Sequence, residues 1–163
     1  MTYPMTAPDT TMPNPADATP IMPASSYLFP RPGKRPLGFQ GSELAMAMSF
    51  TPELPYWYEI NIYRTQDQSF VVALRQFFGS ETEMDRCTAW ECESLLHVFD
   101  SLENYDAAED IRIDDAPIDA MPAAELAAKA YDISARVAAR RAHFASLIGE
   151  LFAEMDAATQ AAG

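Results

Sequence analysis

Hydrophobic and polar residues alternate with a period of two in three consecutive stretches of this chain. The first is residues 43–50, where Leu44, Met46, Met48 and Phe50 share one face. Residues 56–64 and 69–78 follow, and both are rich in β-branched and aromatic residues, which favour strands. A short polar loop at residues 65–68 separates them. The pattern therefore predicts three strands, of which the last two form a hairpin.

After Gly79 the period changes to one that is typical of helices. Ser80 with Glu83 matches a capping box, and apolar residues then recur every three or four positions to about residue 105. A second helical pattern runs from Pro122 to about residue 158, with an acidic loop between the two helices. The second helix is too long for a domain of this size to cover. We expect either a bend near Arg140 or a contact with another chain.

Residues 1–37 differ from the rest because they hold nine of the thirteen prolines. Proline removes backbone donors and is excluded from helix interiors and central strands, so the pattern predicts a disordered tail. The predicted organisation is thus a proline-rich tail at 1–37 and one acidic domain at 38–163. The predicted fold class is α+β: a three-stranded antiparallel sheet packed by two helices.

The end of the predicted tail has the character of a docking peptide. An apolar triplet precedes three cations among prolines, and these residues are Tyr27, Leu28, Phe29, Arg31, Lys34 and Arg35. One interpretation is a linear segment that docks on a partner. The other is that the triplet packs on the chain's own domain, because exposed apolar side chains in a disordered tail are costly.

The predicted hairpin carries aromatic residues on both faces. Trp57 and Tyr63 lie on the face opposite to Tyr58, Ile60 and Ile62. A sheet with two apolar faces is expected to be covered on both, once by the helices and once by something else. The candidates for the second cover are the tail, a second copy of the chain or a partner.

Charge is distributed unevenly along the chain, whose formal net charge is −13. Residues 1–37 carry a net charge of +1, and residues 81–119 hold thirteen acidic residues against two basic ones. Such a charge disfavours direct binding to nucleic acid and to anionic membranes. An acidic ridge imitating a phosphate backbone remains an alternative, with Glu91, Asp110, Asp114 and Asp115 as its candidate residues. A solvated acidic face explains the same pattern.

Candidate chemistry is sparse in this sequence. Cys87, Cys92, Glu93 and His97 fall short of the ligand set and spacing of a structural zinc site. The acidic loop lacks the order of a calcium-binding loop, and no nucleophile elbow, phosphate-binding loop or dinucleotide fingerprint is present. We therefore predict no catalytic residues, no metal and no cofactor.

These observations predict a non-catalytic interaction or accessory subunit. It docks on a partner protein or larger complex, or on further copies of itself as a homo-oligomer, through the tail and the aromatic hairpin. The predicted contacts are Tyr27, Leu28, Phe29, Arg31, Lys34, Arg35, Trp57 and Tyr63. The alternative is an acidic inhibitor that imitates DNA. No secretory signal or membrane span is evident, so we expect a cytoplasmic protein.

Overall fold

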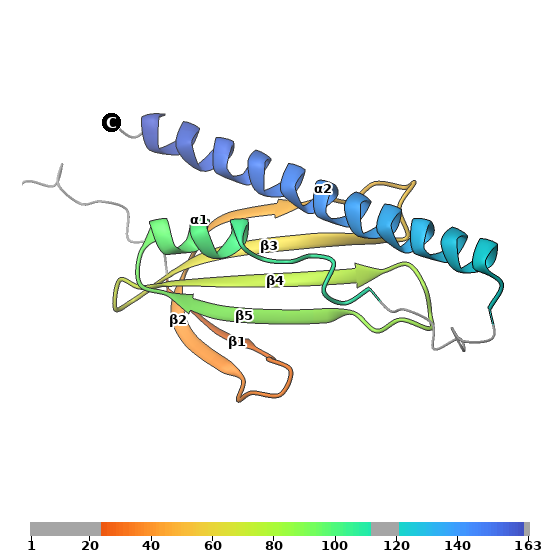
Figure 1. Cartoon of the computed structure of the whole chain (residues 1–163). Helices are drawn as coiled ribbons and strands as arrows, with labels where there is room; N and C mark the ends of the chain where they lie inside the picture. The colour runs from red at the N-terminus through yellow and green to blue at the C-terminus, as the bar shows by residue number, and fades with distance from the viewer. Residues whose placement is uncertain (1–23, 112–120, 162–163) are drawn as a thin grey trace, which may run out of the picture.

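Five antiparallel strands form a single sheet in the order in which they occur along the chain. The structure is a computed structural model that describes residues 24–111 and 121–161. The strands are β1 (Ser25–Phe29), β2 (Leu37–Met48), β3 (Tyr56–Thr65), β4 (Phe70–Phe78) and β5 (Arg86–Cys92). The sheet curls into a half-barrel, and β1 lies against β5 (Figure 1).

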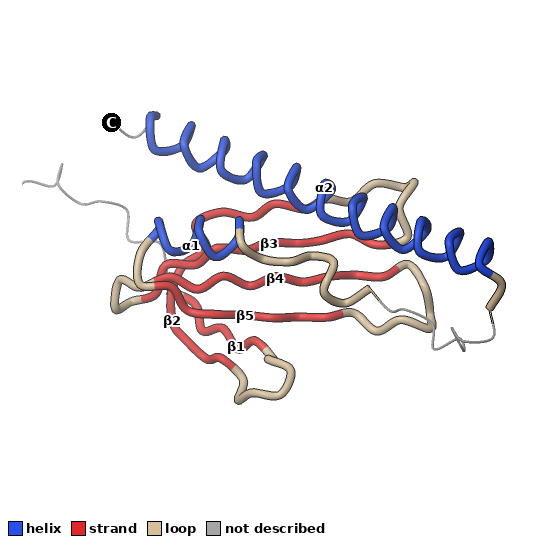
Figure 2. Tube along the Cα trace, in the orientation of Figure 1, coloured by secondary structure: helices blue, strands red, loops and turns tan. Residues whose placement is uncertain are grey.

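Two helices cover the outer face of this sheet. Helix α1 (Leu95–Glu103) lies beside β5, and α2 (Ala123–Ala161) runs diagonally across the sheet (Figures 1 and 2). All the buried residues of α2 lie in its second half, at Phe144, Leu147, Ile148 and Leu151. This spacing places them on one stripe of the helix, against the sheet. The side chains of residues 123–142 are exposed or only partly buried.

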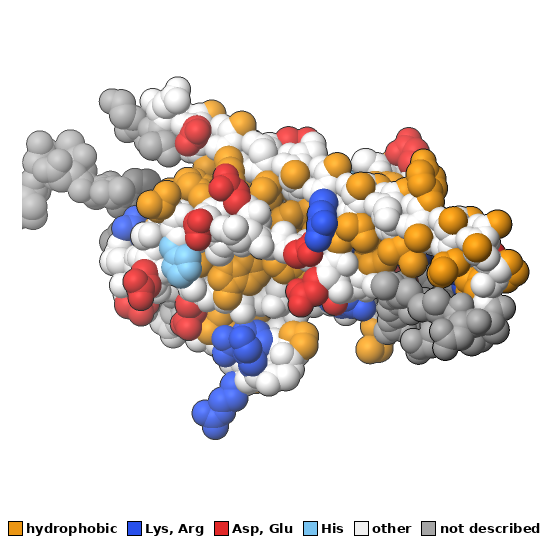
Figure 3. Space-filling model, viewed as in Figure 1, with side chains coloured by type: hydrophobic (Ala, Val, Ile, Leu, Met, Phe, Trp, Pro, Cys, Tyr) orange, Lys and Arg blue, Asp and Glu red, His pale blue; other side chains and the backbone are white. Residues whose placement is uncertain are grey.

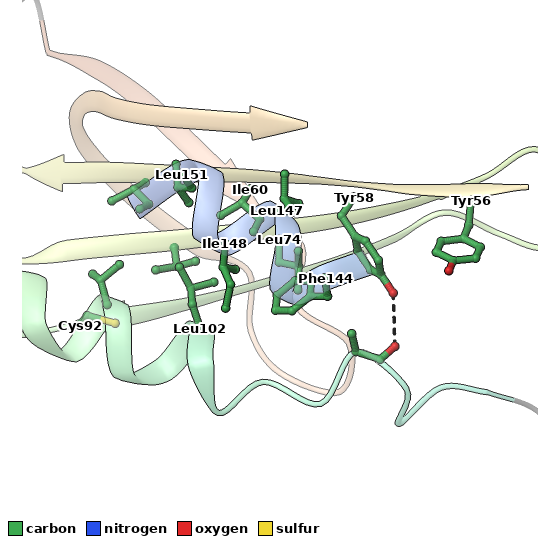
Figure 4. Packing of buried hydrophobic residues seen from close by; sticks show 14 residues of the cluster. Tyr56, Tyr58, Ile60, Leu74, Cys92, Leu102, Phe144, Leu147, Ile148 and Leu151 are labelled. Carbon is green, nitrogen blue, oxygen red and sulfur yellow. Dashed lines mark hydrogen bonds between the residues drawn. The ribbon is translucent and has the colours of Figure 1, made fainter. Parts of the chain in front are cut away.

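The main core lies between the outer face and the helices. Tyr58, Ile60 and Leu74 point from the strands toward the four buried residues of α2 (Figure 4). Tyr58 is anchored at its polar end, because its hydroxyl donates to Ala107 O at 3.3 Å and accepts from Gln76 Nε2 at 3.4 Å. Burial of that hydroxyl raises the pKa of Tyr58 well above its ordinary value.

A second core fills part of the inner face of the half-barrel. Its buried members come from all five strands, and they are Phe29, Leu37, Tyr63, Val71, Ala73 and Ala89. Tyr27 and Phe39 pack against them, and the ring of Tyr27 lies 4.5 Å from that of Tyr63. We call this group the covered half of the inner face.

The protein is α+β, but the predicted three-stranded sheet is wrong. Residues 25–37, assigned above to a disordered tail, contain β1 and the turn into β2. Gly33, with φ of +68°, provides the left-handed backbone of that turn. The alternation of Tyr27 and Phe29 sends both rings into the covered half, and this burial offsets the ordering of a proline-flanked segment.

The predicted helix over residues 80–105 is also wrong in its first part. Residues 86–92 form β5, which pairs with β4 and directs Ala89 inward and Cys92 toward the helices. The signal read as a capping box makes only a turn, with Thr82 N donating to Ser80 Oγ. The helix begins after Ser94, whose Oγ accepts from His97 N at 3.2 Å.

Candidate functional site

The candidate site is the part of the inner face that β1 does not reach. Strand β1 pairs with β2 only from Leu37 to Gly41, and the rest of β2 pairs with β3 alone. Met46 and Met48 stand opposite Asn61 and Glu59 of β3, so they lie on the inner face. Trp57 stacks on Phe77 of β4 with ring centroids 5.3 Å apart.

We call these residues, together with Phe50, the open strip. Phe50 meets the ring of Trp57 edge-on at 5.3 Å. Exposed fractions are 46% for Met46, 48% for Met48 and 58% for Phe50. An apolar surface of this kind is typical of a site that another chain covers.

The backbone at this edge of β2 lacks a neighbouring strand within the described residues. Ser49 N donates to Tyr58 O at 2.9 Å, so Ser49 bonds toward β3. Because alternate residues of an antiparallel strand bond to opposite sides, Ala45 and Ala47 also bond toward β3. The backbone groups of Met46 and Met48 then point away from β3, toward the open edge.

Residues 44–50 carry no charge and no proline. Soluble proteins usually protect a sheet edge with lysine, proline, a bulge or a covering segment. Among the residues that the structure describes, the only such device at this edge is the register shift between Glu43 and Ala45. Leu44, at this shift, is 46% exposed. This stretch is thus an apolar edge with little protection against strand pairing.

Polar groups separate the open strip from the covered half. Arg75 Nη1 lies 3.0 Å from Glu59 Oε1, and the Arg75 guanidinium sits over the ring of Phe29 at 5.5 Å. Beside them, Asn61 Nδ2 donates to Glu43 Oε2 at 3.1 Å. These pairs satisfy charges on the inner face where the aromatic packing of the covered half ends.

The structure distributes the predicted contact residues over three places. Phe29 and Tyr63 are buried in the covered half, and Tyr27 packs beside them, so these rings contact the chain's own domain. Leu28 points outward and is 72% exposed. Trp57 belongs to the open strip.

The three predicted cations lie in the turn between β1 and β2. Lys34 and Arg35 are exposed, and Arg31 is partly buried, with its Nε donating to Arg35 O at 2.8 Å. Basic side chains project from this end of the hairpin, and acidic ones are scattered over the face that carries α1 (Figure 3).

The predicted acidic surface is only partly placed. Glu91 is exposed on β5, whereas Asp110 lies 2.5 Å from Arg86 Nη1 and is paired. Asp106 is paired as well, because Arg141 Nε donates to its carboxylate at 2.9 Å. Hydrogen bonds from Arg141 and from Ala108 N lower the pKa of Asp106 to about 2. Asp114 and Asp115 lie outside the described residues.

Groups suited to catalysis are not brought together in the part of the chain that the structure describes. No cluster of three or more His, Cys, Asp or Glu side chains has the arrangement of a metal site there. Cys87 and Cys92 are free thiols on opposite faces of β5, and burial raises the pKa of Cys92, which disfavours its thiolate. His143 Nε2 donates to Ser49 O at 3.2 Å, which ties α2 to the end of β2.

Sequence reasoning missed Met46, Met48, Phe50 and Phe77 as site residues. The alternation in residues 43–50 predicted a strand, but it did not show that β2 extends beyond the end of β1. The available signal was an uncharged stretch, LAMAMSF, without a lysine or proline to protect it.

Comparison of the chain with protein-family models, with curated proteins and with solved structures found no match. Among the helices that the structure describes, none has both the length and the apolar content required to cross a membrane.

Proposed function

We propose that this protein is a non-catalytic assembly module that binds another chain by strand addition along the open edge of β2. The observation that carries the proposal is the combination of outward-pointing backbone groups at Met46 and Met48 with an exposed, uncharged apolar surface. In strand addition, main-chain hydrogen bonds provide affinity and alternate side chains provide selectivity. The open strip lies beside that edge and supplies the side chains.

The occupant that fits this edge is a second copy of the chain. An antiparallel pairing of two β2 strands about a two-fold axis near Met46 places Leu44 of one copy opposite Met48 of the other. Glu43 then faces uncharged residues rather than another carboxylate, because residues 44–50 are all uncharged. Two chains of net charge −13 therefore meet without opposing acidic side chains at the joint.

Helix α2 adds to this arrangement, because it packs against β2 on the outer face. A two-fold axis perpendicular to the sheet keeps the helices of both copies on the same side. The second half of each α2 would then approach the joint. A strand pair alone buries little surface, so we expect the flanking helices and the open strips to contribute to the contact.

The alternative of an acidic DNA mimic receives no specific support from the geometry. Asp106 and Asp110 are each paired with an arginine, so neither presents a free negative charge. The binding surface proposed here is the β2 edge, and not the tail that was predicted to act as a docking peptide.

The test is the mass of the full-length protein in solution, measured by light scattering after size-exclusion chromatography. A Met48→Lys variant places a charge at the open edge. Met84→Lys is its matched control, because Met84 is 86% exposed in the loop between β4 and β5. We expect wild type and M84K to be dimers at micromolar concentration and M48K to be a monomer.

A wild-type monomer over the whole concentration range would contradict self-association. The broader proposal is tested with a photo-crosslinking amino acid at position 48 or 84 of the full chain in its source cells. Adducts at position 48 but not at 84 support occupation of the edge. Equal adducts at both positions, or none at 48, would reject strand addition.

A further inference from the structure

A cavity of about 610 Å³ is formed by residues that do not belong to the open strip. Its described walls come from the β1–β2 turn, the end of β4, the β4–β5 loop, the start of β5, the segment after α1 and the first half of α2. The apolar part of the lining consists of Pro30, Pro32, Phe78, Met84 and Ile111. The basic part consists of four arginines, Arg31, Arg86, Arg136 and Arg140.

This concentration of arginine is unusual for the chain. The cavity holds four of the eleven basic residues of a protein whose net charge is −13. Two of the guanidinium groups approach the same ring, because Cζ of Arg86 and of Arg140 lie 5.8 and 5.9 Å from the centroid of Phe78. Two like charges held at one ring favour an anion between or beside them.

The acidic residues of the lining do not neutralise this group fully. Asp110 pairs with Arg86, and Asp85 accepts a hydrogen bond from Phe78 N at 3.1 Å. Glu83 is the third acidic residue of the described lining. Among the described lining residues, four arginines against three acids leave an excess of one positive charge.

Arg140 and Arg136 are the cations with spare capacity. Arg140 sits over the Tyr56 ring at 4.4 Å, and no carboxylate of the described residues lies within ion-pair distance of it. Arg136 forms a loose ion pair with Asp132 of the same helix: Nη1 and Oδ2 are 3.9 Å apart, and both side chains are exposed. Such a pair contributes little, so both guanidinium groups remain available.

We propose that this cavity binds a small organic anion, with a carboxylate or phosphate group held by Arg136 and Arg140 and an apolar body against Phe78 and Ile111. Guanidinium groups match the planar, multidentate geometry of these oxyanions better than ammonium groups do. Apolar walls with a few convergent charged groups are typical of small-molecule sites.

The test is a titration of the full-length protein with phenyl phosphate, followed by the chemical shifts of arginine Nε–H and backbone N–H groups. Benzoate distinguishes a carboxylate from a phosphate preference, inorganic phosphate tests the need for the apolar body, and phenol tests the need for the charge. We expect saturable binding of phenyl phosphate or benzoate, weaker binding of inorganic phosphate and none of phenol.

Arg140→Gln and Arg141→Gln form a matched pair for the same titration. Arg141 is the next residue, but it pairs with Asp106 outside this cavity. Loss of a charge-assisted contact predicts about tenfold weaker binding for R140Q and less than about twofold for R141Q. Melting curves of both variants establish that they are folded at the titration temperature.

Equal effects of the two substitutions would overturn the assignment to this cavity. Absence of saturable binding of either organic anion at millimolar concentration would overturn the site itself. Inorganic phosphate binding as tightly as phenyl phosphate would overturn the apolar half of the proposal.

Discussion

The covered half and the open strip occupy the same face of the same sheet, yet the described residues cover only the first of them. Both are built on β3 and β4, with Tyr63 and Val71 in the covered half and Trp57 and Phe77 in the open strip. Their side chains are equally aromatic and apolar. The difference is that β1 closes one end of the half-barrel and stops at Ser25, opposite Gly41. A short edge strand therefore leaves half of an inner face exposed.

The same boundary is visible in the backbone of β2. Up to Gly41 the strand pairs with β1, at Gly41 it pairs with both β1 and β3, and after Gly41 it pairs with β3 alone within the described residues. Gly41 also marks a close approach, since a Cβ added there would lie 2.2 Å from Arg64 O. The comparison shows that the exposed apolar surface arises from an offset between strands rather than from a special motif.

The largest expected difference between the two halves is in the cost of removing a phenylalanine ring. Phe29 is 4% exposed and Phe50 is 58% exposed, so the same substitution probes both. We expect Phe29→Ala to lower the free energy of unfolding by about 3–4 kcal/mol, and Phe50→Ala to lower it by less than about 1 kcal/mol. Urea denaturation at a fixed protein concentration measures both, and similar losses would show that the open strip is part of the stable core.

The boundary at Gly41 provides the next test. Gly41→Ala must displace backbone of β3, which predicts a loss of about 2–3 kcal/mol in the free energy of unfolding. Gly38→Ala is the matched control in the same strand, because its added Cβ makes only ordinary contacts, with Leu28 Cδ1 at 3.5 Å and Tyr27 O at 3.8 Å. We expect that control to change the free energy of unfolding by less than about 1 kcal/mol. Equal effects in thermal and urea denaturation would contradict the close approach of β2 to β3.

The smallest effect is expected in the pH dependence of the covered half. Burial, with the nearby Glu43 carboxylate, raises the pKa of Tyr63 to about 12 from its ordinary value of 10.0. Because the folded state favours the neutral phenol, its contribution to stability is complete below pH 10 and is lost as the pH rises through 12. Tyr63→Phe should reduce this alkaline loss of stability and have no pH-linked effect at pH 7. An unchanged alkaline slope for that variant would refute the assignment.

The hairpin of β3 and β4 could be predicted from the sequence because its alternation is strong and its partners are adjacent in the chain. The long C-terminal helix could be predicted for the same kind of reason, since its apolar stripe is a local feature. The strand β5 was missed because Arg86–Cys92 also fits a helical period when it is read with Leu95 and Phe99. Pairing with β4 decides between the two, and that pairing is a tertiary contact.

The candidate site was harder to predict than the fold. Trp57 and Tyr63 were predicted to be exposed together, but Trp57 is partly buried between Phe50 and Phe77, and Tyr63 is covered by Tyr27 and Phe29. Alternation along a strand gives the face of a side chain, but it does not tell how far the neighbouring strand extends. The open edge depends on that extent, and the arginine cavity depends on segments that are far apart in the sequence.

The most direct test of self-association through β2 is hydrogen exchange of individual backbone amides at several protein concentrations. The Ala45 and Ala47 amides bond toward β3 and serve as internal references, because their protection follows the folding of one chain. Self-association predicts that the Met46 and Met48 amides exchange fast in dilute protein and become protected as the concentration rises. Fast exchange of these two amides at every concentration, with Ala45 and Ala47 protected throughout, would contradict the pairing of two chains along this edge.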